Sequence, residues 1–202
     1  MNGCVIMDFS NKEQIKKLFS KVTLFISLYE NFLQCYEESV LSFYANHVKF
    51  ENGQAIYSFV DPSGNYDKIA QEKYEKSVHR TIRRNDGNWD RDLSLFNWLK
   101  NYSIITDEHF EQLKGIRLFR NKCVHELDIF LGTEFPDDFD DKLNQLIEIR
   151  KHATKWWYLE IEYPTNPEET HPFDIQTANL DEVEVLGNSD LFYDFVKEIV
   201  EK

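Results

Sequence analysis

The sequence is poor in cysteine and has no long apolar run. Cys4, Cys35 and Cys123 are odd in number and lack C-x-x-C spacing, so we expect reduced thiols in a cytoplasmic protein. No apolar stretch approaches the roughly 20 residues that a membrane-spanning helix needs. The N-terminal stretch MNGCVIMDFS has neither the basic flank nor the long apolar core of a secretory signal. These absences argue against a disulfide-stabilised secreted fold and predict no association with a membrane.

Metal-binding patterns are also absent from the sequence. None of the histidines is paired with another ligand residue at the spacing of a zinc site. The histidines stand at positions 47, 79, 109, 125, 152 and 171. We therefore expect no metal and no cofactor, although histidines distant in the chain could still meet after folding.

Acidic residues are concentrated in the last third of the chain. The net charge is −13. Residues 1–133 contain 17 basic and 18 acidic residues, a net of −1, whereas residues 134–202 contain 6 and 18, a net of −12. An isoelectric point near 4.9 argues against a general nucleic-acid coat protein, but it does not exclude a local basic groove.

Apolar residues at spacings of three and four predict five main helices. The first begins at a capping box formed by Ser10 and Glu13 and runs to about Asn46. The others are expected over residues 66–84, 90–102, 106–131 and 136–158. Residues 55–60 (AIYSFV) suit a short strand or an extended crossing. The pattern favours an all-α fold, a helical bundle of about five helices over residues 1–158.

The chain changes in character after residue 158. Residues 158–163 (YLEIEY) and 182–186 (EVEVL) alternate apolar and acidic side chains, which predicts two short strands. Residues 189–200 suit a last helix. We expect residues 159–202 to form a small acidic C-terminal extension that packs on the same domain.

An arginine interrupts the apolar stripe of the fourth predicted helix. At 100° per residue, five apolar side chains fall within about 40° of Arg120. They belong to Leu113, Ile116, Val124, Leu127 and Leu131. Burying a guanidinium without a partner is costly, so Arg120 must pair with a carboxylate, face a cleft or lie at an interface between chains.

The segment IRLFRNKCVHEL adds an asparagine and a histidine to that arginine. Asn121 follows Arg120 directly and His125 lies five residues after it, a combination expected about 0.015 times by chance. FRNKCVHEL resembles the signature of the HEPN superfamily, the higher eukaryotes and prokaryotes nucleotide-binding domains. In that signature an arginine, usually followed by a polar residue, precedes a histidine by four to six positions. Leu127 departs from the toxins that carry a modifiable tyrosine there, so regulation through that tyrosine is not expected.

The resemblance implies an all-α HEPN-like bundle and a metal-independent endoribonuclease. In such enzymes imidazole moves protons of the ribose 2′-hydroxyl and of the leaving oxygen, while guanidinium stabilises the charged phosphorus centre. It therefore implies catalytic roles for Arg120, Asn121 and His125. On one straight helix Arg120 and His125 diverge by about 140°, and the superfamily resolves this with a homodimer whose motif helices share a cleft. It also implies a toxin–antitoxin or defence role, with an antitoxin or another protein as partner.

A basic cluster in residues 73–84 (KYEKSVHRTIRR) suits binding of the RNA backbone. Helical spacing would gather its cations, Lys73, Lys76, Arg80, Arg83 and Arg84, beside the cleft. The alternative is a solvated helix face with local salt bridges. Three roles are open for the acidic extension. It is plain solvated surface, it binds a basic partner, or it competes with RNA for this basic cluster.

Two other functions remain open. The first is a non-catalytic HEPN domain that binds nucleotide or RNA, or that acts as a dimeric protein-interaction module. The second is an acidic, antitoxin-like protein that neutralises a basic partner, which rests only on the extension. The acidic charge favours these alternatives, whereas the intact Arg-Asn-His pattern favours the ribonuclease.

Overall fold

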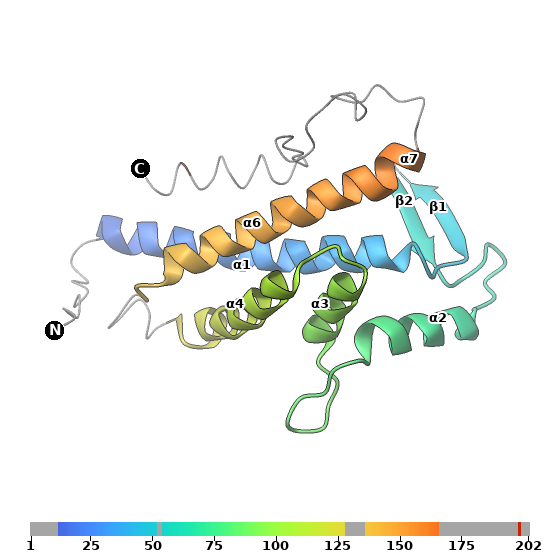
Figure 1. Cartoon of the computed structure of the whole chain (residues 1–202), viewed down its shortest axis with the longest axis horizontal. Coiled ribbons are helices and arrows are strands. Elements are labelled where there is room, and N and C mark those ends of the chain that lie inside the picture. The colour runs from blue at the N-terminus through green and yellow to red at the C-terminus, as the bar shows by residue number, and fades with distance from the viewer. Residues whose placement is uncertain (1–11, 52–53, 128–135, 166–197, 199–202) are drawn as a thin grey trace. The chain divides into compact units, whose positions relative to one another are not determined.

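A computed structural model describes residues 12–51, 54–127, 136–165 and 198 (Figure 1). They form five main helices and a small hairpin: α1 (Lys12–Leu41), β1 (His47–Glu51), β2 (Gln54–Ser58), α2 (Lys68–Tyr74), α3 (Arg91–Asn101), α4 (Asp107–His125) and α6 (Phe139–Trp157). Two π-helical segments extend them, η1 (Glu75–His79) after α2 and η2 (Tyr158–Glu162) after α6, and α7 (Tyr163–Thr165) follows η2. The described part is mostly helical, as predicted. None of its helices is both long and apolar enough to cross a bilayer.

The chain divides into two compact units. Unit 1 contains residues 1–29 and 104–202, and unit 2 contains residues 30–103. Helix α1 is continuous and contributes its first part to unit 1 and its second part to unit 2. The expected division into residues 1–158 and 159–202 stays a prediction, because most of the acidic extension lies outside the described residues.

Three aromatic rings join α1, α4 and α6 in unit 1. The ring of Phe25 meets Phe119 edge-on at 5.4 Å and Phe139 at 5.5 Å, and the last two rings lie 5.7 Å apart. All three side chains are buried. At the rim of this cluster Lys21 of α1 binds Asp140 of α6 at 2.7 Å. The periodic apolar faces predicted for these helices therefore form a real core.

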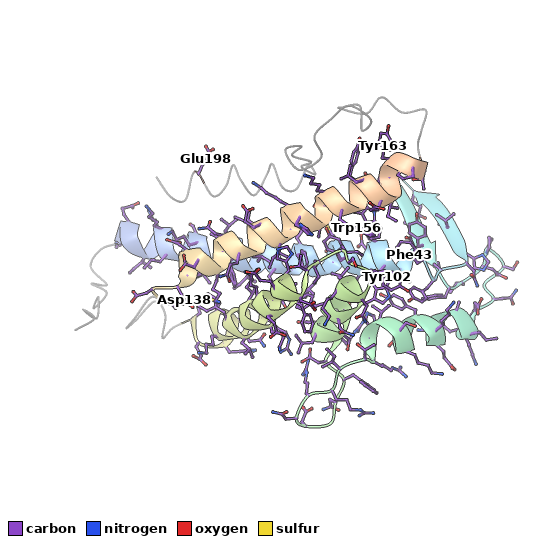
Figure 2. The ribbon with its side chains drawn as sticks, viewed as in Figure 1. Phe43, Tyr102, Asp138, Trp156, Tyr163 and Glu198 are labelled. Carbon is purple, nitrogen blue, oxygen red and sulfur yellow. The ribbon has the colours of Figure 1, made fainter. Side chains whose placement is uncertain are left out.

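Unit 2 has its own aromatic core. Phe32 of α1 packs against Phe96 of α3 at 6.1 Å. The buried indole of Trp98 donates a hydrogen bond to the hydroxyl of Tyr44 (3.0 Å), which satisfies its polar N–H. Tyr102, labelled in Figure 2, stacks on Trp98 at 4.2 Å and stays 56 % exposed. Trp98 is therefore a packing residue.

The predicted helix boundaries agree best where a cap is present. Asp90 caps α3 by accepting a hydrogen bond from the backbone N–H of Leu93 (3.2 Å). The apolar face predicted for residues 136–158 is buried along α6. Helix α1 ends at Leu41, earlier than Asn46, in turns in which Ser42 and the next residues bond back to the last carbonyls. Ser10 and the predicted last helix over residues 189–200 lie outside the described residues, apart from residue 198.

The two strands of the structure lie between α1 and α2, and not in the C-terminal extension where two strands were predicted. β1 and β2 pair antiparallel with Val48 opposite Tyr57, so residues 55–60 begin as a strand, one of the two structures expected there. The strand predicted over residues 158–163 is wrong, because η2 and α7 continue α6 through it. Extending an existing helix carries no nucleation cost, so the helix prevails over the strand preference of six alternating residues. The strand predicted over residues 182–186 lies outside the described residues.

Candidate functional site

Helix α4 carries all three residues of the Arg-Asn-His pattern, and its start is well defined. The hydroxyl of Thr106 accepts a hydrogen bond from the backbone N–H of His109 (3.0 Å), and the N–H of Thr106 donates to Nδ1 of His109 (3.4 Å). Asp107 and Glu108 place negative charge in the first turn, where the helix dipole favours it. The start predicted at residues 106–108 is confirmed.

Arg120 is half-buried on the inner side of α4. Of the residues predicted to share its side, Leu113 and Ile116 are fully buried, whereas Val124 is 41 % exposed, so the predicted stripe is buried only in its first part. Its Nη1 donates a hydrogen bond to Oδ1 of Asn121 (3.2 Å). Its Cζ lies 5.7 Å from the centre of the buried ring of Tyr29 on α1, a cation–π contact worth about 0.5–1 kcal/mol. An amide and an aromatic ring thus orient the guanidinium.

His125 is the last residue of α4 and is exposed. The backbone of Glu126 leaves the helical conformation (φ −124°, ψ 26°), and its N–H donates to the carbonyl of Lys122 (2.8 Å). Helix α4 therefore ends before the predicted end near Leu131. Leu127 is again helical, and residues 128–135 lie outside the described residues. The sequence pattern could not reveal this end, because the apolar spacing continues through Leu127.

The three residues of the pattern are only partly brought together within one copy of the chain. Arg120 and Asn121 are hydrogen-bonded, but among the described residues no hydrogen bond or ion pair joins His125 to either of them. Helical geometry separates Arg120 from His125 by about 140° and Asn121 from His125 by about 40°. One copy therefore presents the guanidinium and the imidazole on different sides of α4.

The cysteine of this helix is not suited to nucleophilic chemistry. Cys123, which lies between Arg120 and His125 in the sequence, is buried. This burial raises the pKa of its thiol to about 12. The thiol therefore stays protonated and is a poor nucleophile. Within the described ranges, no group of three or more histidine, cysteine or acidic side chains is arranged to hold a metal ion.

The basic cluster of residues 73–84 lies in unit 2, and the helical spacing assumed for it is wrong beyond His79. Helix α2 and η1 end there, and Arg80 leaves the helical conformation (φ −121°, ψ 41°). The backbone N–H groups of Thr81 and Ile82 then point to the hydroxyl of Ser94 (3.3 and 3.0 Å). A side chain of α3 thus satisfies N–H groups that a longer helix would have bonded internally.

Nearby carboxylates compensate three cations of this cluster: Lys76 with Glu72 (3.3 Å), Arg80 with Glu75 (3.6 Å) and Arg84 with Asp90 (3.5 Å). The other two contact aromatic rings. Arg83 lies over Trp89 with its Cζ 3.8 Å from the ring centre, and Lys73 lies 5.9 Å from the ring centre of Tyr44. The local salt bridges that were the alternative to RNA binding are therefore present. Lys73 and Arg83, the two ring-bound cations, have the charges least compensated by carboxylates.

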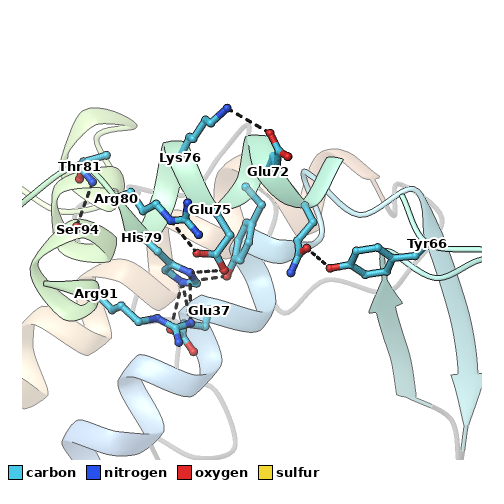
Figure 3. Close-up of polar contacts among 12 residues, drawn as sticks. Glu37, Tyr66, Glu72, Glu75, Lys76, His79, Arg80, Thr81, Arg91 and Ser94 are labelled. Carbon is cyan, nitrogen blue, oxygen red and sulfur yellow. Dashed lines mark hydrogen bonds and ion pairs between the residues drawn. The ribbon is translucent and has the colours of Figure 1, made fainter. Parts of the chain in front are cut away.

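A second polar cluster, which the sequence did not predict, surrounds the buried His79 in unit 2 (Figure 3). Glu37 of α1 contacts its Nε2 (3.3 Å), Glu75 contacts its Nδ1 (3.4 Å), and Nη2 of Arg91 lies 3.2 Å from Nδ1. The hydrogen bond to His79 lowers the pKa of the Glu37 carboxyl, whereas burial raises the pKa of the neighbouring Tyr74. His79 itself is only 2 % exposed, and its contacts fasten α1, η1 and α3 together.

The candidate site is thus a helix end with an oriented guanidinium and an exposed imidazole. Its residue types and spacing are the ones that carry the resemblance, and its geometry is incomplete in one copy. No protein-family model, curated protein or solved structure matches the chain. A functional proposal therefore rests on this local chemistry and on the resemblance of the motif.

Proposed function

We propose that this chain is a metal-independent endoribonuclease of the HEPN type and that it acts as a homodimer. The observation that carries the proposal is the hydrogen bond from Arg120 to Asn121, on a helix that ends at the exposed His125. A guanidinium oriented in this way suits a phosphate, because its planar N–H groups match the phosphate oxygens. The toxin or defence role is supported by the resemblance alone.

The proposed reaction is transesterification within one RNA strand. His125 takes the proton of a ribose 2′-hydroxyl, and the 2′-oxygen attacks the adjacent phosphorus. Arg120 stabilises the negative oxygens of the phosphorane while the bond to the 5′-oxygen breaks. The protonated imidazole returns a proton to the leaving 5′-oxygen, and the products are a 2′,3′-cyclic phosphate and a 5′-hydroxyl. DNA is not cleaved, because it lacks the nucleophile.

The proposed dimer supplies what one copy lacks. Pairing α4 with its counterpart across a twofold axis would place Arg120 of one copy opposite His125 of the other. One exposed apolar residue of α4 supports such an interface. Leu118 (60 % exposed) lies seven residues before His125, about 20° from it around the helix, so both side chains lie on one exposed face of α4.

Mixing two inactive variants tests whether the site is shared. Arg120→Ala and His125→Ala homodimers are each expected to be inactive. After subunit exchange, half of the dimers carry one variant of each kind, and each of those has one intact site of two. The mixture should therefore regain about one quarter of the wild-type cleavage rate at equal total protein.

The matched control mixes His125→Ala with the doubly substituted Arg120→Ala/His125→Ala chain, which cannot form an intact site in any combination. Cleavage that stays absent in the first mixture, although light scattering shows exchanged dimers, would contradict a shared site. A monomer at micromolar concentration would contradict it as well.

The two ring-bound cations are the best candidates in the basic cluster for contacts to RNA. Lys73→Ala/Arg83→Ala is expected to weaken binding of every RNA sequence to a similar extent. It should also lower the slope of log Kd against log salt by about 1.4, because each phosphate contact on a single strand contributes about 0.7. The measurement is RNA affinity over a range of salt concentrations.

Lys12→Ala/Lys16→Ala removes the same charge from exposed positions of α1 and serves as the control. An equal change in slope for both pairs would show a general effect of net charge and no specific role for the basic cluster.

A non-catalytic HEPN domain that binds RNA or a protein partner is the second candidate. The observation that favours it is the separation of His125 from Arg120 within one copy. A net charge of −13 disfavours tight binding of RNA, so it favours the protein-interaction form of this candidate. RNA binding or dimerisation without cleavage would support this candidate.

A further inference from the structure

Two histidines meet between α4 and α6 in unit 1. The ring centres of His109 and His152 lie 4.7 Å apart, with the rings nearly perpendicular at 73°. His109 is half-buried at the start of α4, and His152 is more exposed on α6. Two imidazole rings pack at this distance without electrostatic penalty only while at most one of them is charged.

The ring of His109 also has a structural task that requires a free lone pair. Its Nδ1 accepts the hydrogen bond from the backbone N–H of Thr106 (3.4 Å), which closes the capping box of α4. A doubly protonated imidazole has no acceptor atom. Protonation would therefore remove this bond and add a positive charge at the helix N-terminus, where the dipole disfavours it.

We propose that His109 and His152 form an acid-sensitive clasp, which holds the start of α4 on α6 while both rings are neutral and loosens when they take up protons. The clasp needs only the ring contact and the cap, so it does not depend on ribonuclease activity. Its effect on function would follow from its place, because the helix that it holds also carries Arg120 and His125.

The charged groups that act on the pair are Glu108 of α4 and Lys155 of α6. Burial, and then the charge of His152, lowers the pKa of His109, while Glu108 opposes this shift. Burial, and then Lys155, lowers the pKa of His152. Among these groups only Glu108 favours a proton, so the folded chain holds the two rings neutral to lower pH than the unfolded chain does.

Acid is therefore expected to destabilise the fold through this pair. Above the ordinary histidine pKa of 6.5, both the folded and the unfolded chain leave the two rings neutral. As the pH falls below 6.5, the unfolded chain binds protons before the folded chain does, so unfolding becomes more favourable. If the pKa of a histidine is one unit lower in the folded chain than in the unfolded chain, acidification raises the unfolding equilibrium constant by up to about tenfold.

The test compares the unfolding equilibrium of the full chain between about pH 8 and about pH 5, the range in which histidines titrate. His109→Gln/His152→Gln removes both titrating rings, and glutamine at position 109 can still close the capping box. We expect the double variant to lose most of the acid sensitivity of the wild type. His47→Gln, a change of the same kind in β1, should leave that sensitivity unchanged. Equal acid sensitivity in the wild type and the double variant would overturn the proposal.

A measurement on the unmodified chain keeps the test independent of how the variants fold. Histidine ring signals followed by NMR should show His109 and His152 titrating below pH 6.5. Amide hydrogen exchange in the first turn of α4, corrected for intrinsic rates, should accelerate in the same pH range. Titration of both rings at or above 6.5, or unchanged protection of that turn, would refute the clasp.

Discussion

Replacing His125 by alanine is expected to slow metal-independent RNA cleavage by at least about 100-fold, the usual contribution of a general base or acid. Arg120→Ala should have an effect of the same order, because one lost donor to a developing negative oxygen costs about 100- to 1,000-fold. The assay is RNA cleavage in EDTA, with detection of the 2′,3′-cyclic phosphate product. His125→Ala should leave the melting temperature nearly unchanged because His125 is exposed, whereas Arg120→Ala should lower it slightly because the contact with Tyr29 is lost.

Two further variants separate chemistry from position. Arg120→Lys keeps the charge but loses the planar fork, so most of the activity should still be lost. His47→Ala, which removes a histidine from unit 2, should leave cleavage unchanged. Equal residual cleavage in the wild type, His125→Ala and Arg120→Ala preparations would indicate a contaminating nuclease. That result would leave the binding module as the better account of the chain.

The local parts of this fold could be predicted because local signals determine them. Asp90 and Thr106 mark the starts of α3 and α4, since capping side chains act within one turn. The end of α2 and η1 could not be predicted in this way. It depends on Ser94, a residue of a later helix that takes over two backbone N–H groups. Sequence periodicity contains no information about such a distant acceptor.

The candidate site shows the same division between local and distant information. The place of Arg120 on the inner side of α4 follows from helical geometry, and the structure agrees with it. Its contact with Tyr29 depends on how α1 packs, and so does the cluster around His79, which combines residues from three elements. These contacts were outside the reach of a single motif, because none of them is set by spacing along one helix.

Phe25→Ala is expected to destabilise the fold by about 3–5 kcal/mol, the usual cost of removing a buried phenylalanine ring. Phe25 is fully buried between Phe119 and Phe139, so the truncation leaves a cavity where α1, α4 and α6 meet. It also removes two aromatic contacts, each worth about 0.5–1.5 kcal/mol beyond buried area. Denaturant unfolding at fixed pH and protein concentration measures the loss. Such a loss is a large fraction of the roughly 5–15 kcal/mol that stabilises a typical domain.

Phe19→Ala is the matched control, because it removes the same side chain from the same helix at a position that is 50 % exposed. Its effect should stay within about 0.5 kcal/mol, as for most surface substitutions. Phe25→Leu keeps most of the volume and should fall between the two. If Phe25→Ala cost no more than Phe19→Ala, the three rings would not form the core of unit 1. The placement of α4, and with it the orientation of Arg120 over Tyr29, would then need another physical basis.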